Sequence, residues 1–195
     1  MIFWDVDTQK DFLLPGGRLY VPGAEKIIPK LRELSACAAE RRITIIASAC
    51  AHQLGDAELQ RFGEHCMAGT PGQEKVPETL LPNCFTVPNR DVELPDLKSF
   101  QQIAIEKQHF DVFTNPNTDR VLGQFGRGLL IVLYGVTTDI CVAHAANALL
   151  DRGHRVELVS DAVAALDAGN AAAFVESFCQ RGGVLVQTRD VLRRL

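Results

Sequence analysis

Short apolar segments alternate with longer stretches of helical character, and this alternation constrains the fold more than any other feature of the sequence. The apolar segments are rich in β-branched residues and end at turn-forming residues, which is typical of strands buried on both faces. Because such strands alternate with helices, the pattern predicts an α/β fold with three layers, α/β/α, around a mostly parallel central sheet. Ligands of such folds bind at the carboxyl ends of the strands.

The expected strands are Ile2–Val6, Ile43–Ala47, Leu129–Tyr134, Val156–Val159 and Val184–Val186, and the expected helices are Ala24–Arg41, about Asp119–Phe125, Asp139–Arg152 and Asn170–Arg181. The 195 residues suffice for one substantial core, so we expect a single domain. From about residue 52 to 96 the chain is rich in proline and glycine, with a weak strand candidate at Phe85–Val87. We interpret this segment as an irregular excursion from the core, of the kind that often carries function.

Charge is spread along the whole chain. The 20 Lys and Arg and the 24 Asp and Glu give a net charge of -4, and no basic block of the kind that phosphate binding requires is present. No basic leader precedes the first expected strand, and no apolar run approaches the roughly 18 residues of a membrane span. We therefore expect a soluble, cytoplasmic protein that binds neither nucleic acid nor membranes. The six cysteines form no CxxC pair, which argues against a disulfide framework.

Carboxylates follow the first expected strand at the edge where ligands bind. Asp7 comes directly after the apolar run Ile2–Val6, and this position favours a functional role. Asp5 and Asp11 are interpreted instead as structural groups that cap or pair.

A cysteine follows the expected strand Leu129–Tyr134 in a similar way. Thr137 or Thr138 can cap the next helix, and Cys141 would then lie in its first turn. A helix N-terminus stabilises a thiolate, which is the reactive form of cysteine. Position alone leaves two interpretations open, a nucleophile or a small buried side chain that packs the helix on the sheet.

Three further polar residues lie near expected strand ends, and a fourth follows in the irregular segment. Lys107 ends a weak strand and is either functional or a surface lysine whose stem covers the core. Cys50 and His52 are two residues apart, so their side chains share a face if the strand continues, and His65 follows from the irregular segment. These three residues are either metal ligands or one buried thiol and two loop histidines, because their spacing fits no common structural zinc site.

Several segments, in order along the chain, together resemble one known family. They are DTQKDF at Asp7–Phe12, PGGRLYVPGAEKIIP at Pro15–Pro29, EHCMAGTPGQEKVPE at Glu64–Glu78, IEKQHFDVF at Ile105–Phe113 and GVTTDICV at Gly135–Val142. On these motifs the sequence resembles the isochorismatase-like cysteine hydrolases, and within them the nicotinamidase-related amidases. The resemblance extends over nearly the whole chain and implies the Rossmann-like fold of that family.

The resemblance implies a role for each residue of a catalytic centre. Asp7, Lys107 and Cys141 correspond to the Asp-Lys-Cys triad of the family. A cis peptide bond between Val136 and Thr137 is also implied, with the backbone N–H groups of Thr137 and Cys141 as the oxyanion hole.

The implied metal site departs from the family pattern. Nicotinamidases bind a divalent metal through D-x-H and a later histidine, whereas this chain has Cys50, Ala51 and His52, followed by His65. If a metal binds, a thiolate and two imidazoles favour zinc. The resemblance also suggests that Phe12 lines the substrate pocket, and no organic cofactor is implied.

The function expected from the sequence is hydrolysis of a small carboxamide or related C–N bond through a thioester on Cys141. The partners would be a small-molecule amide and, by resemblance, further copies of the chain in a homodimer or homotetramer. Two alternatives remain, a scaffold or binding protein that has lost turnover and a thiol redox sensor that uses Cys141. No CxxC pair or nearby resolving cysteine is visible in the sequence to support the sensor.

Overall fold

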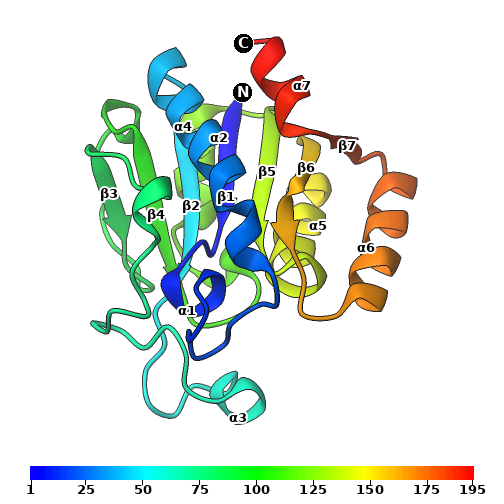
Figure 1. The fold of residues 1–195 in the computed structure, drawn as a ribbon. Helices are drawn as coiled ribbons and strands as arrows, with labels where there is room; N and C mark the ends of the chain where they lie inside the picture. Colours follow the sequence, from blue (N-terminus) through cyan, green and yellow to red (C-terminus); the bar gives the residue numbers. More distant parts are fainter.

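Seven parallel strands form one sheet in this computed structural model, which describes residues 1–195 (Figure 1). The strands are β1 (Ile2–Val6), β2 (Ile45–Cys50), β3 (Cys84–Val87), β4 (Gln102–Lys107), β5 (Leu130–Val136), β6 (Arg155–Ala164) and β7 (Val184–Val186). Their order across the sheet is β3-β4-β2-β1-β5-β6-β7. The central strand, β1, is buried along its whole length, which explains why it is almost continuously apolar.

Helices cover both faces of the sheet, which confirms the predicted fold class. They are α1 (Lys10–Leu13), α2 (Ile28–Arg41), α3 (Leu59–Phe62), α4 (Thr118–Phe125), α5 (Ala143–Asp151), α6 (Ala168–Gln180) and α7 (Thr188–Arg193). Figure 1 shows α2 and α7 in front of the sheet and α4 and α5 behind it. None of the helices combines the length and the hydrophobicity that crossing a membrane requires.

The core is divided by the sheet into two hydrophobic clusters. Along β1, Ile2, Trp4 and Val6 belong to one cluster, whereas Phe3 belongs to the other. This division follows from the two-residue period of a strand, which points alternate side chains to opposite faces. On the Phe3 side, α2 contributes Leu31, Leu34 and Ala38, which recur at helical spacing on its buried face.

The carboxyl ends of the strands lie at one edge of the sheet, here called the carboxyl edge. The excursion between β2 and β3 lies across this edge and carries α3 (Figure 1). Two buried carboxylates near β1 fasten the excursion: Asp11 accepts hydrogen bonds from the backbone N–H groups of Cys66 (2.6 Å) and Arg18 (3.1 Å), and Asp5 pairs with Lys75 at 3.0 Å. Asp5 and Asp11 therefore have the structural role that the sequence suggested.

Several element boundaries differ from the prediction. The second strand begins at Ile45 rather than Ile43, because the Ile43 N–H bonds to the Ala38 carbonyl and closes the end of α2. The strand predicted at Val156–Val159 continues as β6 to Ala164, and β3 within the excursion pairs with β4. The polar helix α7, with its capping box, was not predicted.

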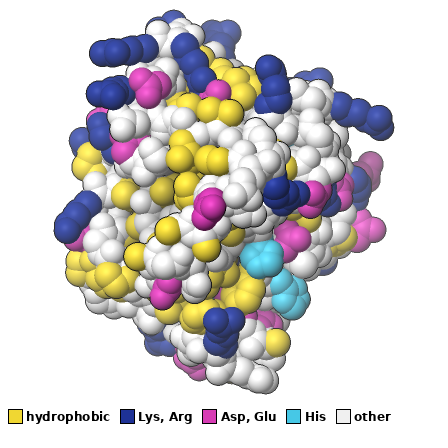
Figure 2. Space-filling view, turned by 90° about the vertical axis from the view of Figure 1, so that its right-hand side faces the viewer, with side chains coloured by type: hydrophobic (Ala, Val, Ile, Leu, Met, Phe, Trp, Pro, Cys, Tyr) yellow, Lys and Arg dark blue, Asp and Glu magenta, His cyan; other side chains and the backbone are white.

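The side of the molecule that carries α6 is not uniformly polar. Figure 2 shows hydrophobic side chains gathered between lysine, arginine and acidic side chains on this side. Near it, the outermost strand β7 leaves Val184 and Leu185 exposed.

Candidate active site

Asp7 lies directly beyond the last residue of β1, at the centre of the carboxyl edge. Its backbone has a φ of 49°, a conformation that non-glycine residues rarely adopt and that is typical of functional sites. The carboxylate is fully buried, and its Oδ1 accepts a hydrogen bond of 2.6 Å from the Ser48 hydroxyl. Its other oxygen, Oδ2, lies 2.9 Å from Nζ of Lys107. The carboxylate is thereby held in one orientation.

Lys107 is the last residue of β4, two strands away from β1. Its side chain is buried, so it is not the surface lysine that the sequence left open. Besides Asp7, its Nζ contacts Sγ of Cys50 at 3.1 Å and Sγ of Cys141 at 3.5 Å. An ammonium group has three hydrogens, and here it has three acceptors. Lys107 therefore links the carboxylate to two thiols.

Cys141 lies in a π-helical turn (Thr138–Val142) between β5 and α5. The regular helix predicted from Asp139 begins only at Ala143. Thr137 stands at the N-cap of the turn, but its side chain makes no capping bond and its Oγ1 is buried without a partner. The expected cap is therefore absent, and the thiol lies in a different turn from the one predicted.

The peptide bond between Val136 and Thr137 is cis, as the resemblance implies. The backbone N–H of Thr137 makes no hydrogen bond with the rest of the chain. It is therefore free to donate to a ligand bound next to Cys141.

Burial and the neighbouring charges set the protonation of this cluster. Burial alone would lower the pKa of Lys107, but the Asp7 carboxylate beside it raises it well above its usual value. Burial raises the pKa of the Cys141 thiol, and Lys107 offsets only part of this effect. At neutral pH Lys107 is therefore an ammonium and Cys141 a thiol, whereas its predicted position at a helix N-terminus favoured the thiolate.

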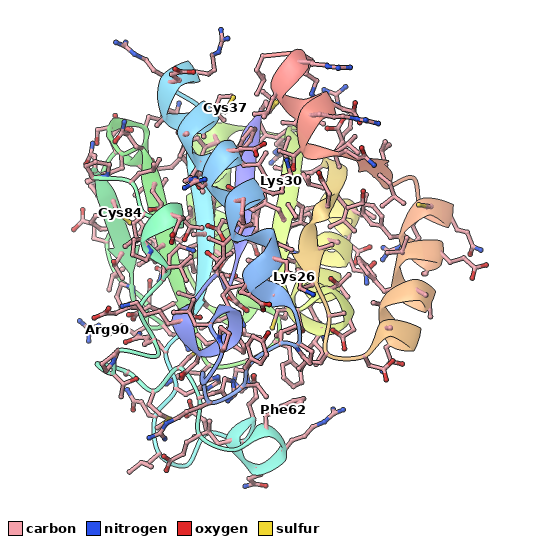
Figure 3. The ribbon with its side chains drawn as sticks, viewed as in Figure 1. Lys26, Lys30, Cys37, Phe62, Cys84 and Arg90 are labelled. Atoms are coloured by element: carbon pink, nitrogen blue, oxygen red, sulfur yellow. The ribbon has the colours of Figure 1, made fainter.

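A small cavity lies over Cys141. It is lined by Phe12, Leu19, Glu58, Phe62, Phe110, Thr137, Ile140, Cys141 and Leu166. Phe12 was expected here from the resemblance. Phe62 comes from α3, at the end of the molecule opposite Cys37 (Figure 3), and its ring meets that of Phe110 edge to face at 5.9 Å. No motif predicted that these two residues, far apart in sequence, would meet.

Beside the cavity, two histidines converge on a glutamate that the sequence analysis missed. Glu58 Oε1 lies 3.7 Å from Nε2 of His52 and 3.5 Å from Nε2 of His65. The two Nε2 atoms and Glu58 Oε2 are buried and have no hydrogen-bond partner. Glu58 lies in the loop before α3 and belongs to none of the quoted motifs, so the sequence carried no signal for it.

In both histidine rings, Nδ1 already has a hydrogen-bond partner. Nδ1 of His65 faces the Gly63 carbonyl at 3.0 Å, and Nδ1 of His52 faces an Asp56 carboxylate oxygen at 3.2 Å. An acceptor at each Nδ1 leaves each Nε2 facing Glu58, the side on which a metal could bind. Two imidazoles and a carboxylate are ligands that zinc accepts, so the residues fit a divalent metal.

Cys50 lies between this cluster and the triad. Its sulfur is within 4.8 Å of ligand atoms of His52 and Glu58, and also 3.1 Å from Lys107 Nζ. Burial and the Asp7 carboxylate raise the pKa of the Cys50 thiol well above its usual value. The structure thus brings Cys50, His52 and His65 together beside the cavity.

The burial of Glu58 alone would raise its pKa. The nearby imidazoles of His52 and His65 and the charge of Lys107 outweigh burial and lower the pKa of Glu58 to about 2. Glu58 is therefore a carboxylate at neutral pH, the form that binds metals.

The arrangement of the sheet defines the class of protein. The chain superposes on N-carbamoylsarcosine amidase from Thermoplasma acidophilum with a TM-score of 0.77 and 26% identity, over 96% of this chain and 95% of the other. Pyrazinamidase of Pyrococcus horikoshii, in complex with zinc, gives 0.76 and 28%, over 95% and 98%. An isochorismatase-like hydrolase from Alkaliphilus metalliredigens shares the fold, with a TM-score of 0.82 at 22% identity over 99% and 97%. The chain thus has the α/β fold of isochorismatase-like proteins.

The sequence itself confirms this relationship. The model of the isochorismatase domain matches residues 88–190, more than half of the chain. The chain therefore belongs to the isochorismatase family, as its motifs predicted. Comparison with curated protein sequences gives no match. Two of these neighbours, N-carbamoylsarcosine amidase and pyrazinamidase, are amidases by name.

Proposed function

We propose that the chain is a cysteine amidohydrolase that cleaves a small carboxamide through a thioester on Cys141. The observation that carries this proposal is the contact of Asp7, Lys107 and Cys141 around one Nζ atom, beneath a small cavity. A nucleophile, a proton acceptor and a fixed cation are the groups that acyl transfer through a thiol requires.

In the first half of the reaction, Asp7 takes the proton of the Cys141 thiol and the sulfur attacks the carbonyl carbon of the amide. The backbone N–H groups of Thr137 and Cys141 stabilise the oxyanion, a contribution worth about 10² to 10³ in rate per donor. The C–N bond then breaks, and Asp7 returns the proton to the leaving nitrogen. A primary amide releases ammonia at this step.

In the second half, a water molecule adds to the thioester while Asp7 accepts one of its protons. The C–S bond breaks, the product leaves as a carboxylic acid, and the Cys141 sulfur recovers its proton. The raised pKa of the resting thiol fits this sequence, because deprotonation is coupled to attack and needs no standing thiolate.

A metal would be held by His52, Glu58 and His65, with Cys50 as a further donor at its edge. When bound there, it would supply a Lewis-acidic contact for a polar atom of the substrate. The zinc complex of the pyrazinamidase neighbour supports this assignment.

A second candidate function, thiol redox sensing, gains support from Cys50. No resolving cysteine was visible in the sequence, but Cys50 and Cys141 both contact Nζ of Lys107. Hydrogen peroxide would oxidise Cys141 to a sulfenic acid with loss of water, and the Cys50 thiol would displace a second water to form a disulfide. Mass spectrometry after peroxide treatment, with and without a reductant, tests this candidate.

Ammonia release from a panel of small amides tests the proposed hydrolase activity. The panel comprises nicotinamide, pyrazinamide, maleamide, maleamate, a ureido acid and simple aliphatic amides. We expect turnover of at least one amide by the wild type and none by Cys141→Ser. An inert wild type would favour the scaffold alternative.

A further inference from the structure

Thr137 carries a buried hydroxyl to which the rest of the chain supplies no partner. The residue is 4% exposed, and its Oγ1 has no hydrogen-bond partner. A buried hydroxyl without a hydrogen bond costs free energy, so a group of this kind points to a function. Because Thr137 also lines the cavity over Cys141, a ligand in that cavity is the partner that the position of the hydroxyl indicates.

No other side chain of the cavity offers a neutral O–H or N–H donor. Seven of the nine lining residues are hydrophobic, and the other two are Glu58 and Thr137. Glu58 directs its Oε1 toward the rings of His52 and His65, at 3.7 and 3.5 Å. The Thr137 hydroxyl is therefore a single neutral donor in a mostly apolar lining, where a hydrogen bond to a developing charge is strongest.

The π-helical turn fixes the position of Thr137 relative to Cys141. The Thr137 carbonyl accepts hydrogen bonds from the backbone N–H groups of Ile140 (3.1 Å) and Val142 (3.0 Å), the residues on either side of Cys141. The Thr137 N–H makes no bond with the chain and, under the proposed function, donates to the oxyanion. Oγ1 is attached through Cβ to the same Cα, so it stays near that N–H in each staggered rotamer, and β-branching restricts the rotamers.

We propose that Thr137 is a catalytic residue through its side chain, and that its Oγ1–H donates a third hydrogen bond to the oxyanion, beside the N–H groups of Thr137 and Cys141. When the Cys141 sulfur bonds to the carbonyl carbon, the π electron pair moves to the oxygen, which then has three lone pairs for three donors. The C–N bond breaks as that pair returns, and the hydroxyl keeps its proton throughout. This inference rests on the proposed function and adds a donor to its machinery.

Two reagents that react with the Cys141 sulfur by different routes test this role. N-acetylimidazole transfers its acetyl group through a tetrahedral intermediate, in which an oxyanion forms before the C–N bond to imidazole breaks. Iodoacetamide alkylates the sulfur by displacement of iodide and forms no oxyanion. A change in the thiolate fraction affects both reactions, so it cancels in the ratio of acetylation to alkylation. Imidazole release, less the rate of Cys141→Ser, gives the first rate, and peptide mapping of Cys141 gives the second.

We expect Thr137→Val, which keeps the shape of the side chain and removes the hydroxyl, to lower the ratio of acetylation to alkylation about 10²-fold. Thr137→Ser keeps the hydroxyl and should stay within about threefold of the wild type. A ratio in Thr137→Val within about threefold of the wild type, or an equal loss in Thr137→Ser, overturns the proposal. Thr137→Ala repeats the test if Thr137→Val does not fold.

Stability separates a catalytic hydroxyl from a structural one. Because the Thr137 hydroxyl has no partner in the free protein, Thr137→Val should leave the Tm unchanged or raise it. Thr118→Val is the matched control, since it removes a buried hydroxyl that donates to the Val112 carbonyl at 2.7 Å. This control should lower the Tm and leave the ratio of the two rates unchanged. A lower Tm of Thr137→Val with an unchanged ratio would mark the hydroxyl as structural and overturn the proposal.

The same rates separate this proposal from the proposed function. A wild type that reacts with N-acetylimidazole no faster than Cys141→Ser contradicts the hydrolase and the role of Thr137 with it. Acetylation that depends on Cys141 but is equally fast in Thr137→Val overturns the role of Thr137 alone. With an amide that the wild type hydrolyses, Thr137→Val should lower kcat about 10²-fold and change KM little, because the third donor acts on the transition state.

Discussion

Lys107 connects the reactive groups, because its buried ammonium contacts the Asp7 carboxylate and the Cys141 thiol at once. Lys107→Ala leaves Asp7 as an unpaired buried charge, and we expect a loss of about 3 to 5 kcal/mol in the free energy of unfolding. Lys98→Ala, at an exposed lysine, should cost less than about 0.5 kcal/mol. Denaturant titration of both variants measures the difference, and equal stabilities would contradict the burial of the ion pair.

The reactivity of Cys141 toward iodoacetamide should depend strongly on pH. Burial raises the pKa of this thiol, so the thiolate fraction is small at neutral pH and increases about tenfold per pH unit as the pH rises toward that pKa. Lys107 lowers the pKa, so Lys107→Ala should slow alkylation at every pH below it. Labelling rates measured from pH 6 to 9 test this, and a plateau at neutral pH would contradict a raised pKa.

Cys141→Ser should abolish turnover and leave the fold intact. The hydroxyl replaces the thiol with little change of shape, but it is a far weaker nucleophile, and the loss of one member of a catalytic unit typically costs about 10⁴ or more in kcat. Cys179→Ser, at an exposed position, serves as the control. Amide hydrolysis and thermal melting of both variants are measured, and more than about a tenth of the wild-type rate in Cys141→Ser would refute the assignment.

At the level of elements, the contact between β1 and β5 positions the triad. Gly135 in β5 has a φ of +119°, and a Cβ there would lie 2.1 Å from the Val6 carbonyl oxygen. We expect Gly135→Ala to destabilise the protein by about 3 kcal/mol or more and to reduce activity with it. A Cβ at Gly123 in α4 would meet no atom within 4 Å, so Gly123→Ala should be neutral or stabilising. Urea titration compares the two variants.

The sequence predicted the elements that local pattern controls. Buried strands such as β1 are apolar and β-branched, and the residues that follow each strand lie at the carboxyl edge. Asp7 and Cys141 could therefore be placed there before the structure was known. The π-helical turn around Cys141 could not be predicted, because no residue pattern distinguishes it from the first turn of an α-helix. The missing capping bond of the Thr137 side chain could not be predicted for the same reason.

At the scale of the whole molecule, the excursion completes the site from residues that no local pattern connects. Glu58 and Phe62 come from this segment and line the cavity with Cys141, and Asp11 and Asp5 help to fasten the excursion to β1. These contacts are tertiary, so no periodic pattern in the sequence predicts them. The resemblance indicated His52 and His65, but the glutamate between them became visible only in three dimensions.

We predict that the purified protein binds zinc at this cluster. The Nε2 atoms of His52 and His65 and a carboxylate oxygen of Glu58 are buried without partners, and a metal would satisfy them. Elemental analysis of protein prepared without a histidine tag should find about one equivalent, and zinc should raise the Tm of the wild type but not of His65→Ala. Less than about a tenth of an equivalent, with activity unchanged by a chelator, would refute the metal site.

The central claim, a thioester on Cys141, is tested most directly by mass spectrometry of the enzyme quenched with acid during turnover of a small carboxamide. The account predicts that the peptide containing Cys141 gains the mass of the acyl group, that hydroxylamine removes this mass, and that Cys141→Ser shows neither the adduct nor ammonia release. Ammonia release accompanied by an acyl adduct on any other residue, or ammonia release that persists in Cys141→Ser, would contradict it.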